Sequence, residues 1–203
     1  MTDSPDVLEL TDPLAEALGA LQPGERFRYR YDDAVRLAGH SCPTVAGAWV
    51  MARGALAALY PGQTPVRGDI EITMGGPPTD GSLGPISQVL SLLTGAAGDT
   101  GFGGLGGRWR RRGLLRFDPA LAGAVRFRRV DTGASVDVRF DASAAPRAPE
   151  VAALLPLIVA GSATEAQRRQ FATLWQERVG SIVTGEPARF LDIRAGHVGA
   201  VES

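Results

Sequence analysis

The chain has 203 residues, of which 44% are hydrophobic, and this suits one globular domain with a sizeable core. Its formal net charge of -1 gives no overall attraction to nucleic acid or to an anionic membrane. Every basic residue is arginine, which excludes Schiff-base lysine chemistry and the lysine of a phosphate-binding loop.

The spacing of the apolar residues predicts an α+β fold, with helices packed on a mixed, largely antiparallel sheet. In chain order we expect a helix over 6–21, a strand over 26–31, helices over 32–39 and 43–60, a strand over 66–74, a helix over 85–95, three consecutive antiparallel strands over 108–118, 123–131 and 134–141, helices over 148–161 and 164–185, and an extended tail. We divide this single domain into a lead-in over 1–25, a core over 26–145, and C-terminal helices and tail over 146–203.

The predicted helix over 43–60 is the element most relevant to function. Gly39 ends the preceding helix, and Pro43 suits the first helical position, where a backbone N–H is not needed. The helix is rich in Ala and Gly and has almost no charge beyond Arg53. We therefore expect it to be buried and packed closely on the sheet.

The link before this helix contains the only cysteine, Cys42, and one of two histidines, His40. Cys42 is predicted at the N-cap, where the partial positive charge of a helix N-terminus favours a thiolate. Residues i and i+2 of an extended link can point the same way, so an imidazole and a thiolate would converge there. This pair is half of a zinc-type site. The plainer interpretations are a small apolar thiol and a turn histidine.

Residues 38–56, AGHSCPTVAGAWVMARGAL, resemble the signature of the FmdE family of formylmethanofuran dehydrogenase proteins, roughly His-Gly-His-x-Cys-Pro-Gly before an Ala/Gly-rich helix. Later segments, PISQVLSLLTG and GFGGLGG, follow the order of motifs in that family. The matching positions there are Thr94, Gly95, Gly101, Gly103 and Leu105. The resemblance covers most of residues 30–195. It implies an α+β fold of the FwdE/GAPDH-domain-like kind, a bound metal usually described as zinc, and a homodimer, without the C-terminal zinc ribbon of many members.

The chain departs from this signature at several polar positions. The residues that replace the polar or ligating groups of the family are Ala38, Pro85, Gln88, Phe102 and Gly104. Only His40 and Cys42 remain, and we predict them as metal ligands.

Five further residues are candidates to complete the site. They are Asp80, Ser82, Gln88, Asp99 and His197, the last by folding back or from a dimer partner. The plainer interpretations are ordinary turn chemistry beside glycine for the two aspartates and a solvated tail residue for His197.

The segment RWRRR, Arg108–Arg112, is the densest basic run. An aromatic ring among arginines can stack on bases, but the balanced charge of the chain favours a solvated strand face, so we expect no nucleic-acid partner. A small anionic ligand suits these guanidinium groups better. The glycine-rich loop before this run follows a helix and precedes a strand, which is the opposite of a dinucleotide-binding turn.

The location of the protein is predicted from three features. The opening MTDSPDVLEL is acidic, so we expect no signal peptide. The longest apolar run, residues 151–161, contains a proline and is shorter than the ~20 residues of a membrane span. One cysteine excludes an intrachain disulfide framework. We therefore expect a cytoplasmic protein with a reduced thiol and no membrane partner.

Three hypotheses on function follow, and whether the protein is an enzyme stays open. The first is a zinc-binding protein with His40 and Cys42 as ligands and with redox or small-molecule chemistry at an open coordination position. The second is an enzyme that uses Cys42 as a metal-free nucleophile with His40 as its base. The third is a non-catalytic, dimeric binding module. An apolar stripe on the helix over 164–185 is a core or dimer contact: Phe171, Leu174, Trp175 and Val179.

Overall fold

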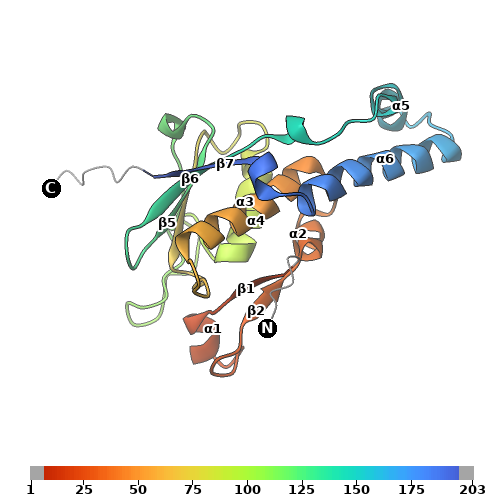
Figure 1. Cartoon of the computed structure of the whole chain (residues 1–203). Coiled ribbons are helices and arrows are strands. Elements are labelled where there is room, and N and C mark those ends of the chain that lie inside the picture. The colour runs from red at the N-terminus through yellow and green to blue at the C-terminus, as the bar shows by residue number, and fades with distance from the viewer. Residues whose placement is uncertain (1–6, 197–203) are drawn as a thin grey trace.

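The computed structural model describes residues 7–196 and confirms the predicted α+β class (Figure 1). The helices are α1 (Pro13–Ala17), α2 (Tyr31–Ala38), α3 (Pro43–Leu59), α4 (Leu83–Thr94), α5 (Glu150–Val159) and α6 (Glu165–Val183). The strands are β1 (Leu8–Leu10), β2 (Phe27–Tyr29), β3 (Ile70–Met74), β4 (Leu115–Phe117), β5 (Val125–Arg129), β6 (Ser135–Phe140) and β7 (Leu191–Ala195). Three single 3-10 turns lie at Pro119–Leu121, Ala142–Ala144 and Pro187–Arg189.

Five strands form one mixed sheet in the order β4-β3-β5-β6-β7, and β1 pairs with β2 in a separate antiparallel sheet. The sheet is antiparallel except at one edge, where β4 lies parallel to β3 with Leu115 opposite Ile72. The prediction of three consecutive antiparallel strands is therefore wrong for the first of them. β5 and β6 form the expected hairpin, whereas β4 pairs on the other side of β3.

Helix α3 forms the centre of the core, as its composition predicts. Trp49 has no exposed surface, and the alternate residues of β3 that face the helices are equally buried. Gly47 lies directly against the ring of Phe140 in β6, because a Cβ built on it would be 2.5 Å from that ring. Small residues on α3 thus let the helix approach the sheet closely.

The N-terminal lead-in is not the single helix that we predicted over 6–21. Residues 8–10 form β1, and α1 begins only at Pro13. Asp12 explains the break, because its carboxylate accepts hydrogen bonds from the amides of Leu14 and Ala15 and so caps α1. Because Asp12 is extended as the N-cap of α1, one helix cannot run unbroken from Leu10 into α1.

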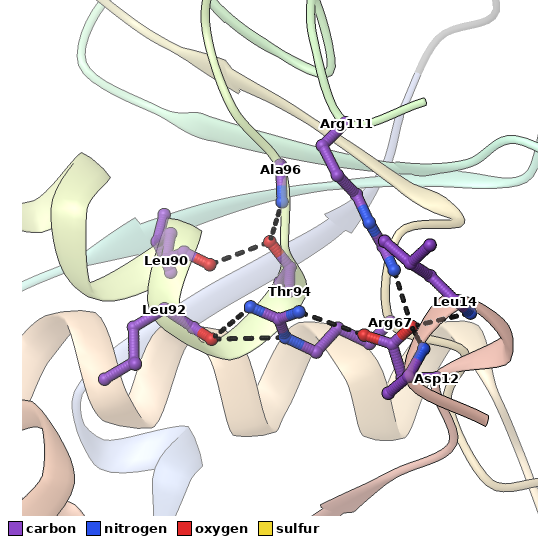
Figure 2. Close-up of polar contacts among 9 residues, drawn as sticks. Asp12, Leu14, Arg67, Leu90, Leu92, Thr94, Ala96 and Arg111 are labelled. Carbon is purple, nitrogen blue, oxygen red and sulfur yellow. Dashed lines mark hydrogen bonds and ion pairs between the residues drawn. The ribbon is translucent and has the colours of Figure 1, made fainter. Parts of the chain in front are cut away.

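The same carboxylate anchors the lead-in to the core (Figure 2). Asp12, only 3% exposed, also accepts from Arg67 at 3.0 Å and from Arg111 at 2.6 Å. Arg67 donates twice more to the carbonyl of Leu92 near the end of α4. One buried carboxylate therefore joins the lead-in, the segment before β3 and the segment before β4.

Helix α5 contacts the outer end of α6, far from the sheet in Figure 1, and α6 then returns along α3. Thr164 caps α6 through a reciprocal pair of hydrogen bonds with Gln167. Only Val151 and Leu154 are buried in the almost uncharged α5. In the described part of the chain, no helix has the length and apolar character that crossing a membrane requires.

Candidate functional site

His40, Ser41 and Cys42 form the link between α2 and α3, as the sequence predicts. Gly39 ends α2 in the left-handed conformation, with φ of 73°, and its amide donates to the carbonyl of Val35. Cys42 is the extended N-cap of α3, and Pro43 is the first helical residue. These local rules place a histidine and a thiol at the start of a 17-residue helix.

The imidazole of His40 is exposed, and its Nδ1 lies 2.9 Å from the carbonyl oxygen of Ala38. A carbonyl can only accept a hydrogen bond, so Nδ1 carries the proton in this contact. The lone pair of Nε2 is then available for a metal ion or a proton. Histidine ligands of metals commonly show this arrangement, in which a backbone carbonyl fixes the tautomer and the ring orientation.

Cys42 is half-buried, and its side chain packs against the edge of the hydrophobic core. Within the described structure, its side chain accepts no capping hydrogen bond from the first turn of α3. The thiol therefore sits beside the amides of a helix N-terminus without being used to cap them.

Ser41 is the centre of a polar network that the sequence analysis missed. Its hydroxyl donates to Oε1 of Gln176 at 2.9 Å and therefore accepts from the Tyr31 hydroxyl at 3.0 Å. The indole N–H of Trp175 donates to the Ser41 carbonyl at 3.0 Å. Helix α6 thus holds the residue between His40 and Cys42 by two hydrogen bonds. No sequence signal could have found this, because the partners lie more than 130 residues apart.

Tyr31 lies next to Cys42 as well as Ser41. Burial of the phenol raises the pKa of Tyr31, and the hydrogen bond with Ser41 opposes this shift. The nearby Cys42 raises the pKa further, because a thiolate would repel a phenolate. The phenol therefore stays protonated at neutral pH and keeps its hydrogen bond to Ser41.

The other candidate residues within the described part of the chain are exposed. Asp80 and Ser82 line a shallow cavity of about 480 Å³ beside Gly123, and its described lining includes neither His40 nor Cys42. Gln88 and Asp99 are exposed. His197 lies outside the described residues. Within residues 7–196, no three His, Cys, Asp or Glu side chains come close enough together to hold one metal ion.

The basic run Arg108–Arg112 is not a strand with a uniformly solvated face. Arg108 stacks on Trp109, with its guanidinium 4.6 Å from the ring centroid, and both remain at least partly exposed. Arg111 is only 6% exposed and pairs with Asp12. Gly68 makes room for it, because a Cβ at Gly68 would overlap the Arg111 guanidinium. This arginine therefore has a structural role.

Comparison of the sequence with models of known protein families and with curated proteins gives no match.

Proposed function

We propose that this protein binds one divalent transition-metal ion, zinc in the first instance, through Nε2 of His40 and the thiolate of Cys42. The observation that supports this best is the hydrogen bond from Nδ1 of His40 to the Ala38 carbonyl. It orients the imidazole and, in the neutral tautomer, places the lone pair on Nε2, two residues from a thiol at a helix N-terminus. Imidazole and thiolate are the ligands that zinc prefers in proteins.

The proposed site is open, since two of the four usual positions of a zinc ion have no ligand from residues 7–196. His197 or a second chain would supply a third ligand, and water or a substrate would take the remaining position. We also propose that the chain is a divergent member of the FmdE family. The motif around His40 and Cys42 supports this, although several other polar positions of the family are replaced.

A cobalt(II) titration tests the proposal, because cobalt replaces zinc and gives a thiolate-to-metal absorption band when a cysteine is bound. We expect a saturable band in the wild type, no band in Cys42→Ser, and weaker binding in His40→Ala. The variant Asp99→Ala, at an exposed loop position, is the matched control and should bind as the wild type does. A wild-type spectrum identical to that of Cys42→Ser would refute the proposal.

A second candidate function is a metal-free nucleophilic thiol at Cys42 with His40 as its base, and the position of Cys42 at the N-cap of α3 without a capping hydrogen bond supports it. It predicts rapid alkylation of Cys42 by iodoacetamide in the presence of a chelator, slowed in His40→Ala. The metal site predicts the reverse, because bound metal protects the thiol and the chelator exposes it. A thiol that does not react under either condition would exclude both functions and favour the third hypothesis, a non-catalytic binding module.

We further propose a homodimer that forms through α5. This ten-residue helix has one charged residue, Glu150, and leaves Leu155 and Val159 exposed in the single chain, at 42% and 78%. Two such helices can pair about a two-fold axis without bringing like charges together. The α5–α6 pair extends well away from the sheet, so this contact is accessible (Figure 1).

A further inference from the structure

The segment between α4 and β4 forms a tight hairpin, the light-green loop at the lower left of Figure 1. Leu105 and Arg108 exchange two backbone hydrogen bonds of 3.0 and 2.9 Å, and both glycines between them have positive φ. Such a two-residue turn is the tightest connection of a hairpin. The carbonyl of Phe102 accepts from the amides of Arg111 and Arg112 and closes the base of the loop. The hairpin thus has a defined shape.

Three apolar side chains of this hairpin are accessible to solvent. Phe102 is 42% exposed and Leu105 is 45% exposed, while Trp109 is partly exposed. Trp109 has a φ of 59°, which bulky residues rarely adopt, so the surrounding loop holds it in a strained conformation. Leu105 and Arg108 are directly opposed in the hairpin, and such pairs place their side chains on one face. Apolar and basic groups therefore lie next to each other on this loop.

The hairpin and the start of β4 also have an uncompensated positive charge. Residues 97–117 contain five arginines and one acidic residue, Asp99. Arg111 is buried against Asp12, and the other four arginines are exposed: Arg108, Arg110, Arg112 and Arg116. These four and Asp99 carry a net charge of +3. None of the four forms an ion pair with a carboxylate of residues 7–196.

We propose that this hairpin docks on the surface of an anionic lipid bilayer. Phe102 and Leu105 would enter the boundary between the headgroups and the acyl chains. The exposed arginines would bind the phosphates and carboxylates of the lipid headgroups, which a guanidinium group binds well. Trp109 suits the same depth, because the indole ring combines an apolar body with one N–H donor.

A bilayer fits this hairpin better than single-stranded nucleic acid does. Bases bind by stacking on open ring faces, and Arg108 already stacks on Trp109, with its guanidinium 4.6 Å from the ring centroid. The aliphatic side chain of Leu105 offers nothing to a base, whereas it can enter the apolar part of a bilayer.

The proposal concerns contact with a membrane surface and not a membrane span. The expectation of no membrane partner used the net charge of the whole chain and the length of its apolar runs, and neither describes the local charge of the hairpin. The hairpin and α5 lie at opposite ends of the molecule in Figure 1. This proposal and the dimer proposal can therefore fail separately.

Sedimentation of the purified protein with lipid vesicles tests the proposal. We expect binding to vesicles of phosphatidylcholine mixed with phosphatidylserine, and much weaker binding to vesicles of phosphatidylcholine alone. Added salt should weaken the binding, because it screens the arginines.

Two triple variants with the same net charge separate the hairpin from the rest of the surface. The first replaces Arg108, Arg110 and Arg112 by glutamine, and we expect it to bind the mixed vesicles about a hundredfold more weakly, at about fivefold per arginine. The matched control replaces three exposed arginines of ion pairs elsewhere, Arg36, Arg169 and Arg194, and should bind nearly as the wild type does.

A double variant tests the apolar contact. Phe102→Ser with Leu105→Ser keeps the charge of the hairpin and should bind the mixed vesicles at least about tenfold more weakly. Thermal unfolding checks that every variant is folded.

Four results would overturn the proposal. They are a wild type that does not bind the mixed vesicles, equal binding by the two triple variants, a double variant that binds as the wild type does, and a thymidine oligonucleotide that binds as tightly as the mixed vesicles. The last result would assign the hairpin to nucleic acid instead.

Discussion

At the scale of single residues, the strongest constraint on this fold is the carboxylate of Asp12. It accepts two backbone and two arginine hydrogen bonds while almost fully buried. Burial lowers the pKa of Arg111, and the Asp12 carboxylate opposes this shift by favouring the charged guanidinium. The cluster is stable only as a set, because each charge is desolvated and depends on the others.

Asp12→Ala should therefore be strongly destabilising. It leaves the Arg111 charge buried without its carboxylate and removes the cap of α1, so we expect a loss of about 3–5 kcal/mol in the free energy of unfolding. The control is Asp192→Ala, which removes an exposed pair with Arg194 and should cost at most about 1 kcal/mol. Urea unfolding measures both, and equal losses would contradict this role for Asp12.

Tyr60 gives a prediction on pH. Burial raises the pKa of Tyr60 to about 12, and the nearby Arg129 guanidinium only partly opposes this. The folded state thus holds the phenolic proton more tightly than the unfolded state, whose pKa is about 10. The stabilisation is complete below pH 10 and is lost as the pH rises from 10 to 12. We expect the free energy of unfolding to fall over this range by up to about 1.4 kcal/mol per pH unit for this group, and Tyr60→Phe to reduce the slope.

The sequence identified His40 and Cys42 but not the residues that hold them. The start of α3 follows from Gly39 and Pro43, which are local signals, and the structure confirms it. Gln176 is 135 residues from Ser41, and Arg67 is 55 residues from Asp12. Arg111, 99 residues from Asp12, has no local feature that separates it from its exposed neighbours in the basic run.

At the scale of elements, the structure confirms the helices that local sequence signals define. It differs from the prediction at β1 and in the partner of β4, both of which depend on residues distant in sequence. α3, α4 and α6 are long segments, and their starts carry local signals such as Pro43 and the capping pair of Thr164 and Gln167. Val7, Leu10 and Leu14 have a spacing that also fits a helix, and the pairing of β1 with β2 makes residues 8–10 a strand. β4 is three residues long, and nothing in its sequence shows that β3 is its parallel partner.

Two helical glycines should respond to alanine in opposite directions. Gly47→Ala places a methyl group against the ring of Phe140 in the tightly packed core and should cost about 1–3 kcal/mol. Gly180→Ala in α6 meets no atom within 4 Å and should stabilise the protein by about 0.5–1 kcal/mol, because alanine favours the helix. Thermal unfolding of the two variants measures the difference, and the same sign in both would contradict the close approach of α3 to β6.

At the scale of the whole molecule, the α5–α6 pair connects the proposed dimer surface with the candidate site. α6 contacts α5 at one end and holds Ser41 along its length. A second chain bound at α5 would thus act on the helix that positions the link between His40 and Cys42.

Replacing both Leu155 and Val159 by glutamate should give a monomer, whereas the wild type should show twice the 21.3 kDa mass of one chain. Leu18→Glu is the control, since Leu18 is 63% exposed at the end of α1 and should leave the dimer intact. Light scattering measures the mass. A monomeric wild type, or a dimer that survives the double substitution, would show that α5 is not the interface.

The central proposal is the metal site at the start of α3, and elemental analysis of the purified protein beside its Cys42→Ser variant tests it most directly. We predict about one zinc ion per chain in the wild type and none in the variant, because the thiolate is the stronger of the two ligands. Equal metal content in the two proteins, or none in either, would contradict the proposal.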